Sequence, residues 1–143
     1  MSLRIEKGYG SWSREYSPEV WPHECGLDKL CKFDKYFLNK EKLEENLKTN
    51  PRESLRLIHL NEEDCNSSNA DATGGEPVFK NGKGLGRITS GAYGYTVGMS
   101  LALGYLKDAI PGDNVEVMVL GKPHRGKVLG SSPFDPEGKI LRG

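Results

Sequence analysis

Residues 77–128 consist of short β-prone runs separated by tight-turn signals, and this pattern restricts the possible folds more than any other feature. Asn81-Gly82 separates PVFK from KGLGRIT, and Asn-Gly between two β-prone runs is the strongest short-range signal for a two-residue hairpin. The apolar run at residues 102–106 predicts a buried strand. The alternating valines at 115–119 follow a Pro-Gly turn and predict another.

A last strand is predicted through Val128, after a Gly-Lys-Pro turn at residues 121–123. Residues 52–60, RESLRLIHL, predict an earlier strand with one solvent-facing side. Five or six short strands joined by tight turns indicate a small antiparallel barrel or sandwich. We therefore expect a mainly β protein with one or two short helices (α+β).

Patterns outside these strands are weaker. Residues 39–49, NKEKLEENLKT, predict one short helix, because helix formers run throughout and Pro51 lies beyond its end. The short apolar run at residues 27–33 predicts one strand. The polar stretch at residues 62–77 predicts a long mobile loop, since it has little apolar surface to bury.

Charge and length exclude several classes of protein. The 143 residues fit one ordinary domain, or a small domain with an appendage. Twenty Lys and Arg residues balance twenty Asp and Glu residues, so no overall field favours nucleic acid or anionic lipid. No apolar run approaches the roughly 18 residues of a membrane span, and no secretory signal is recognisable. We expect a soluble protein with neither nucleic-acid nor membrane partners.

The cysteines and histidines predict no metal or redox site. Cys25, Cys31 and Cys65 are an odd number without a CxxC pair, which argues against a disulfide framework or a zinc site and indicates a reducing compartment. We expect Cys25 to be a buried structural thiol. The histidines lie far apart in sequence and lack helical i,i+4 partners, so no metal ligands are predicted, and His124 is expected to be exposed in a turn.

Two further patterns resemble catalytic motifs only superficially. Gly82, Gly84 and Gly86 do not have GxGxxG spacing and no helix follows them, so a nucleotide loop is not predicted. Thr89 and Ser90 are expected to satisfy backbone groups. The residues alone therefore predict no catalytic site.

The N-terminal stretch RIEKGYGSW, residues 4–12, combines charges, glycines and aromatic rings. Arg4 and Glu6 are two apart, so on an extended strand they would share a face. They could then bind an anionic group and an N–H-rich heterocycle, with Tyr9 and Trp12 as flat walls. The alternative is a surface salt bridge with aromatic rings packed at a domain edge.

Several ordered motifs resemble one known family. LRIEKGYGSW, PHECGL and KFDKYFLNKEKL are similar to the late part of the folate-binding domain of the T-protein (aminomethyltransferase) superfamily, and RIEKGY most resembles its sarcosine and dimethylglycine dehydrogenases. GEPVFKNGKGLGRITSGAYGYTVGMSLALGYL resembles the start of that superfamily's C-terminal barrel. GSSPFDPEGKILRG resembles the closing motif of sarcosine dehydrogenases.

The resemblance implies a remnant of the folate-binding domain at residues 1–51 and a small antiparallel β-barrel at residues 52–143. Arg4 and Glu6 match the family's R-x-E-x-G motif, which lies by the folate pocket, and Glu24 matches the carboxylate of its P-x-E-x-G-L motif. Tyr9 would pack against the pterin or p-aminobenzoate ring, so these four residues would contact tetrahydrofolate. No counterpart of the family's catalytic aspartate and no FAD-binding glycine motif is found, so no catalytic residue is assigned. FAD would belong to an upstream module of the parent protein.

The function implied is that of a fragment of a folate-linked oxidative demethylating enzyme, inactive alone, whose parent passes a one-carbon unit to tetrahydrofolate. Two alternatives stay open: a non-catalytic regulatory or scaffold protein with the same domains, and a stand-alone aminomethyltransferase. Folate is the expected small-molecule partner, and self-association through a truncated face is possible. The expected location is cytoplasmic, or the mitochondrial matrix in a eukaryote.

Overall fold

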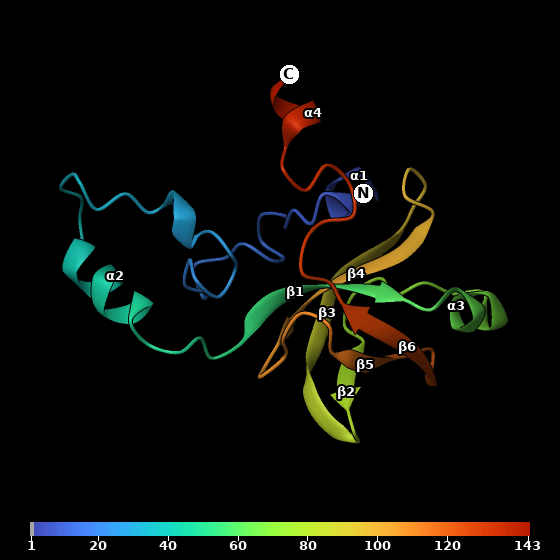
Figure 1. Ribbon diagram of the computed structural model, residues 1–143. Helices are drawn as coiled ribbons and strands as arrows, with labels where there is room; N and C mark the ends of the chain where they lie inside the picture. Colours follow the sequence, from blue (N-terminus) through green and yellow to red (C-terminus); the bar gives the residue numbers. More distant parts are fainter. Residues whose placement is uncertain (1) are drawn as a thin grey trace.

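Six antiparallel strands form a closed barrel in the computed structural model, which describes residues 2–143 (Figure 1). Around the barrel the strands follow the order β1-β4-β3-β2-β5-β6, and β1 pairs with β6 from Ile58–Val128 to Leu60–Gly126 to close it. The predicted mainly β, antiparallel barrel is confirmed. The strands are β1 Ser54–Leu60, β2 Pro77–Lys80, β3 Lys83–Gly94, β4 Met99–Leu106, β5 Asn114–Val119 and β6 Lys122–Val128.

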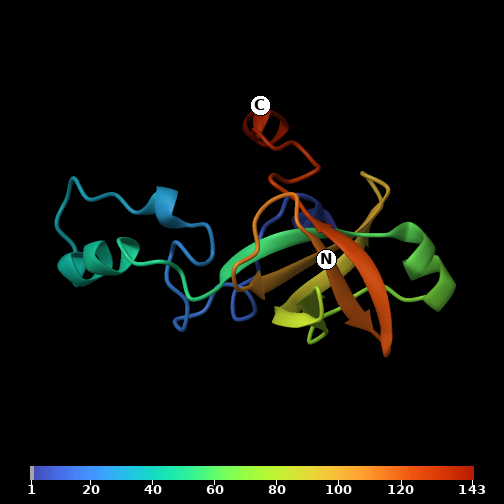
Figure 2. The same ribbon diagram turned by 60° about the horizontal axis from the view of Figure 1, so that its bottom comes forward.

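The helices are short and lie outside the barrel (Figures 1 and 2). In both views α2 and the chain around it lie to one side of the barrel, whereas α1 lies near the segment that follows β6. The helices are α1 Ser2–Glu6, the 3-10 helix η1 Asp28–Leu30, α2 Lys40–Leu47, α3 Glu62–Ser68 and α4 Lys139–Arg142. The predicted helix at residues 39–49 is present as α2.

The predicted hairpin joins β2 and β3. Asn81 and Gly82 have φ values of 52° and 76°, the left-handed conformation that a type I′ turn requires at both central positions. Lys80 and Lys83 face each other directly across the turn. The local sequence therefore sets this connection without help from the rest of the fold.

The barrel interior is apolar, and one strand is buried on both of its faces. Ile58, Ala102 and Leu106 belong to the interior cluster with the valines of β5. Leu101 and Leu103 alternate with them along β4, and therefore point outward. Ile5 of α1 packs there, together with Leu57. This packing is why the sequence of β4 is almost continuously apolar.

Two predictions for the connecting segments are wrong. Residues 62–77 do not form one long loop, because α3 occupies their first seven positions. The Asn61 side chain accepts hydrogen bonds from the backbone N–H groups of Glu63 and Asp64, a standard N-cap. Cys65 is the one buried residue of this polar helix.

Residues 27–33 form turns and η1 rather than a strand, and residues 2–51 contain no named strand at all. The closed barrel has no free edge to which another strand could add. The turn predicted at residues 121–123 is instead formed by Leu120 and Gly121, which have φ values of 48° and 76°. Lys122 and Pro123 already belong to β6.

Candidate functional site

Three buried glutamates, Glu6, Glu15 and Glu24, dominate the N-terminal segment, which we define as residues 2–51. Each is at most 1% exposed. A buried carboxylate is stable only where hydrogen bonds or a counter-charge replace water. The groups that satisfy these three therefore show how the segment is held in place.

Glu15 joins the N-terminal segment to β3. Its Oε1 accepts a hydrogen bond from Thr89 Oγ1 at 2.6 Å and a short one from Ser90 Oγ. Its Oε2 accepts from the Ser11 N–H at 2.7 Å and lies 3.4 Å from Arg4. Burial opposes ionisation of Glu15, but the bonds from Ser90, Thr89 and Ser11 and the charge of Arg4 outweigh it and lower its pKa.

Glu24 is engaged by Arg52, just before β1. The Arg52 Nε and Nη2 atoms donate to Glu24 Oε1 and Oε2 at 2.8 and 2.7 Å, and the backbone N–H groups of Trp21 and Arg52 donate as well. The Arg52 hydrogen bonds lower the pKa of Glu24 to about 2. Both carboxylate oxygens are thus occupied, and Glu24 holds the segment against the start of the barrel.

Glu6 ends α1 and faces the β3–β4 turn. Its Oε1 accepts from the Thr96 N–H at 3.2 Å, while its Oε2 is buried without a hydrogen-bond partner among residues 2–143. Gly94 leaves room for this side chain, since a Cβ there would lie 2.8 Å from Glu6 Cγ. Glu6 therefore has one unused acceptor in a closed environment.

Arg4 and Tyr9 are brought together by the turn after α1. Arg4 Nη1 donates to the Tyr9 carbonyl oxygen at 3.0 Å. The Tyr9 ring is 48% exposed, and Lys7 Nζ lies 5.9 Å from its centroid. Lys7 also pairs with Asp135 Oδ2 at 3.2 Å, which connects this turn to the segment after β6.

A cavity of about 330 Å³ lies beside Tyr9, between the N-terminal segment and the outer face of the barrel. Apolar, aromatic and glycine residues make up most of its lining, and two cationic side chains, Lys7 and Arg56, also line it. Tyr9 and Tyr16 provide the aromatic surface. Such a cavity suits a flat ligand with an anionic group.

The structure corrects the geometry expected for Arg4 and Glu6. They lie on α1 rather than on an extended strand, and residues two apart on a helix do not share a face. Of the four predicted residues, the structure brings Arg4 and Tyr9 together. Glu6 and Glu24 are buried elsewhere, and of the four only Tyr9 lines the cavity.

Sequence reasoning missed Glu15, Arg52 and the Lys7–Asp135 pair. Glu15 was recognisable only as one carboxylate in a polar stretch, and its hydroxyl partners are 74 and 75 positions away. Thr89 and Ser90 were expected to satisfy backbone groups. Thr89 does donate to the Leu103 carbonyl, but both hydroxyls also bind Glu15.

The histidines and cysteines are only partly as expected. His124 is 1% exposed in β6 rather than exposed in a turn, because α3 covers it. Cys25 is buried, as predicted. In the described range, 2–143, no three His, Cys, Asp or Glu side chains are arranged to hold a metal ion. None of the described helices is long and apolar enough to cross a membrane.

The structure is thus a closed six-stranded antiparallel barrel with an N-terminal segment held on its outer face. The structure superposes on glycine cleavage system aminomethyltransferase T from Bartonella henselae with a TM-score of 0.79 and 24% identity. The match covers 93% of this chain and 37% of that chain. At this identity the likeness shows the shared fold.

Residues 56–135 match the family model of the glycine cleavage T-protein C-terminal barrel domain, and the chain belongs to this family. Mouse mitochondrial sarcosine dehydrogenase is 32% identical over 99% of this chain, and human mitochondrial dimethylglycine dehydrogenase is 31% identical over 90%. The chain spans only 16% and 15% of those relatives. The Aquifex aeolicus aminomethyltransferase is 34% identical over 92% of this chain and 35% of its own length.

Proposed function

We propose that this chain is the C-terminal part of a folate-linked oxidative demethylating enzyme of the sarcosine or dimethylglycine dehydrogenase kind. The observation that carries the proposal is the extent of the similarity to sarcosine dehydrogenase, which covers 99% of the chain and so includes the N-terminal segment as well as the barrel. Residues 1–51 would be the end of the folate-binding domain, and residues 52–143 its C-terminal barrel.

Tetrahydrofolate is the ligand proposed for the cavity beside Tyr9. A pteridine or p-aminobenzoate ring is flat and stacks well on a tyrosine, and the folate glutamate carries carboxylates that Lys7 and Arg56 could face. When bound, tetrahydrofolate supplies the nitrogen that takes up the one-carbon unit. The cavity residues bind and orient the ligand, and no residue of this chain is assigned a catalytic step.

Arg4, Glu6 and Glu24 would act in the same site by holding the segment that positions Tyr9. Arg4 binds the Tyr9 carbonyl oxygen directly. Glu24 fastens the chain at Arg52, and Glu6 holds α1 against the β3–β4 turn. In a larger parent, upstream residues would complete the pocket, and FAD would bind there rather than here.

Calorimetric titration with tetrahydrofolate tests the ligand assignment. We expect micromolar binding that Tyr9→Ala weakens at least tenfold, because the ring provides the flat contact surface. Trp12→Ala is the matched control, since Trp12 is also aromatic and exposed but does not line the cavity. Equal affinities for wild type and Tyr9→Ala would refute the assignment of Tyr9, and no binding by the wild type would refute a folate site in this chain.

A second candidate function is favoured by another relative. The mouse mitochondrial pyruvate dehydrogenase phosphatase regulatory subunit is 33% identical over 73% of this chain. A non-catalytic regulatory protein is therefore the alternative, and a stand-alone aminomethyltransferase is a third. A flavin-binding glycine motif encoded upstream would support the enzyme, and its absence there would support the regulatory protein.

We further propose that the isolated chain is inactive and self-associates. Turnover of sarcosine or dimethylglycine by the chain alone would contradict the first point. Leu30, Tyr36 and Leu38 of the N-terminal segment are largely exposed, and such apolar groups favour association. Because the dehydrogenase relatives are mitochondrial, the matrix is the proposed location in a eukaryote.

A further inference from the structure

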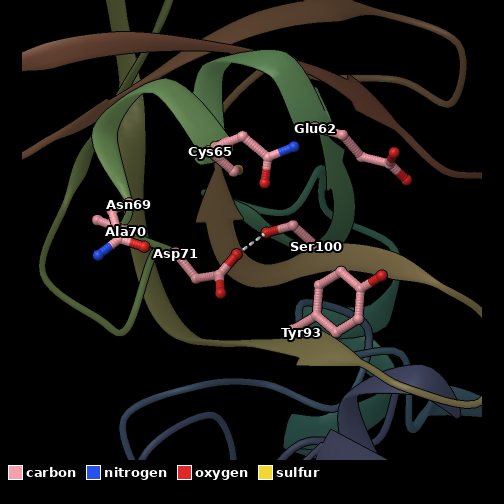
Figure 3. Close-up of a pocket in the computed structure, with 8 residues that line it drawn as sticks. Glu62, Cys65, Asn69, Ala70, Asp71, Tyr93 and Ser100 are labelled. Carbon is pink, nitrogen blue, oxygen red and sulfur yellow. Dashed lines mark hydrogen bonds between the residues drawn. The ribbon is translucent and has the colours of Figure 1, made fainter.

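A second cavity of about 200 Å³ lies between α3 and the strands β3 and β4, on a part of the barrel that the proposed folate site does not use (Figure 3). Cys65 of α3 lines it, opposite Tyr93. Asp71 and Ser100 are hydrogen-bonded to each other across the base of this cavity. The two cavities share no lining residue.

His124 of β6 lies behind the thiol. Cys65 Sγ is 3.6 Å from His124 Nδ1, and His124 Nε2 is 2.9 Å from Ser68 Oγ. Cys65 and Ser68 are three residues apart, so both face the same side of the short helix. A thiol, an imidazole and a hydroxyl thus form one continuous chain of polar contacts.

The surroundings of Ser68 determine which imidazole nitrogen carries the proton. Ser68 Oγ lies 3.0 Å from the Asp64 carbonyl oxygen and 3.2 Å from that of Cys65, and both of these can only accept. The single hydroxyl proton is used on these carbonyls, so Ser68 Oγ accepts the Nε2–H of His124. Nδ1 is then unprotonated and accepts from the Cys65 thiol.

The geometry points to Cys65 as a nucleophilic thiol with His124 as its base, and we propose that it takes a small uncharged electrophile of the aldehyde class. Sγ attacks the carbonyl carbon, a new S–C bond forms and the C=O π bond opens. The thiol proton passes to His124 Nδ1 and from there to the carbonyl oxygen. The product is a hemithioacetal, and the step needs no oxidant or reductant.

The cavity explains the size and charge of the electrophile. A space of about 200 Å³ is close in volume to a cavity that holds one small ring, so it suits a small molecule. Glu62 and Asp71 line it and disfavour anions, while Asn66 and Asn69 provide amide donors for a carbonyl oxygen. Burial raises the pKa of the Cys65 thiol, so the thiol is protonated at rest and requires the base.

Cys25 is an internal control for every measurement. It is 8% exposed, as is Cys65, and it also lines a cavity. Burial raises its thiol pKa too. Its Sγ lies 3.5 Å from the Pro22 carbonyl oxygen and, within residues 2–143, has no imidazole contact. Cys65 has the imidazole contact, and it also interacts with the side chains of Ser100 and Asp71, whereas Cys25 has neither.

The test is alkylation of the native chain, with each cysteine quantified by peptide mass spectrometry. Iodoacetamide, which is small and uncharged, is expected to modify Cys65 at least tenfold faster than Cys25. Iodoacetate has the same size but is an anion. Its preference for Cys65 over Cys25 should be smaller, because Glu62 and Asp71 line the cavity of Cys65 whereas Lys7 and Arg56 line the cavity of Cys25. Acetaldehyde is expected to slow the alkylation of Cys65 by iodoacetamide and to leave the alkylation rate of Cys25 unchanged.

Two variants separate the base from its support. His124→Asn keeps an acceptor near Sγ but no base, and should slow alkylation of Cys65 about 10²-fold, the usual size of a general-base effect. Ser68→Ala removes the group that fixes the tautomer of His124. It should slow the alkylation of Cys65 by a smaller factor than His124→Asn does, without changing the alkylation rate of Cys25. If the alkylation rate of Cys25 rises in a variant, the fold of that variant is loosened. The proposal is then judged on the ratio of the Cys65 and Cys25 alkylation rates in the wild type. Equal rates at Cys65 and Cys25, or no protection by acetaldehyde, would overturn the proposal.

Discussion

The barrel and the N-terminal segment are stabilised by different kinds of interaction. The barrel has a continuous ladder of backbone hydrogen bonds around an apolar interior. In the N-terminal segment the buried residues are Ile5, Cys25 and the glutamates Glu6, Glu15 and Glu24. The barrel is therefore held by packing, whereas the segment is held mainly by hydrogen bonds and ion pairs to its buried carboxyl groups.

This difference predicts different sensitivities. Apolar packing changes little with pH but tolerates no extra volume at close contacts. A buried carboxylate is stabilising only while it is ionised and its donors are in place. Each of the following experiments would alter one region and leave the other largely intact, or show that they are not independent.

The largest effect is expected for Gly86→Ala in β3. A Cβ at this position would lie 2.0 Å from the Tyr105 carbonyl oxygen, which is backbone and cannot move aside. We expect a loss of about 3 kcal/mol or more in the free energy of unfolding, measured with urea. Gly84→Ala is the control, because its nearest neighbour would be Phe79 Cε1 at 3.9 Å. Similar midpoints for the two variants would contradict the described β3–β4 contact.

Glu15→Gln should have the next largest effect. The amide keeps the shape but loses the charge that accepts from Thr89, Ser90 and Ser11. We expect a loss of about 1–3 kcal/mol, with faster proteolysis of the N-terminal segment and unchanged hydrogen exchange in β4. Glu19→Gln, at an exposed position, should change neither. A uniform loss of hydrogen-exchange protection across the barrel amides would show that the barrel and the N-terminal segment unfold together.

The smallest effect is expected from mild acid. Glu24 has its pKa lowered from the usual 4.5 to about 2, and that of Glu15 is also lowered. Their stabilisation is complete well above pH 4.5 and is lost as the pH falls through the folded-state values. Between pH 6 and pH 4 the segment should lose at most about 1 kcal/mol per carboxylate.

Hydrogen exchange of residues 2–51 at several pH values measures this loss against the barrel amides. The Glu15→Gln, Glu24→Gln double variant should show a flatter pH dependence. An equally steep dependence in that variant would assign the effect to other groups.

The local elements were predictable because their signals lie within a few residues. The Asn81-Gly82 turn, α2 and the alternating strand β5 each follow from neighbouring side chains. The helix α3 was missed because its N-cap, Asn61, precedes a segment with almost no apolar residues. The folate assignment of Arg4, Glu6, Tyr9 and Glu24 rests on family resemblance and stays a prediction for all four.

The sequence by itself determined that this chain forms short antiparallel strands with tight turns, since backbone propensity and side-chain alternation act locally. The tertiary structure alone decided that Glu15 meets Thr89 and Ser90, and that His124 lies behind Cys65. Closure of the barrel brings together residues that are 59 to 75 positions apart. No local pattern encodes such distances, because the pairing depends on strand order and register around the whole barrel.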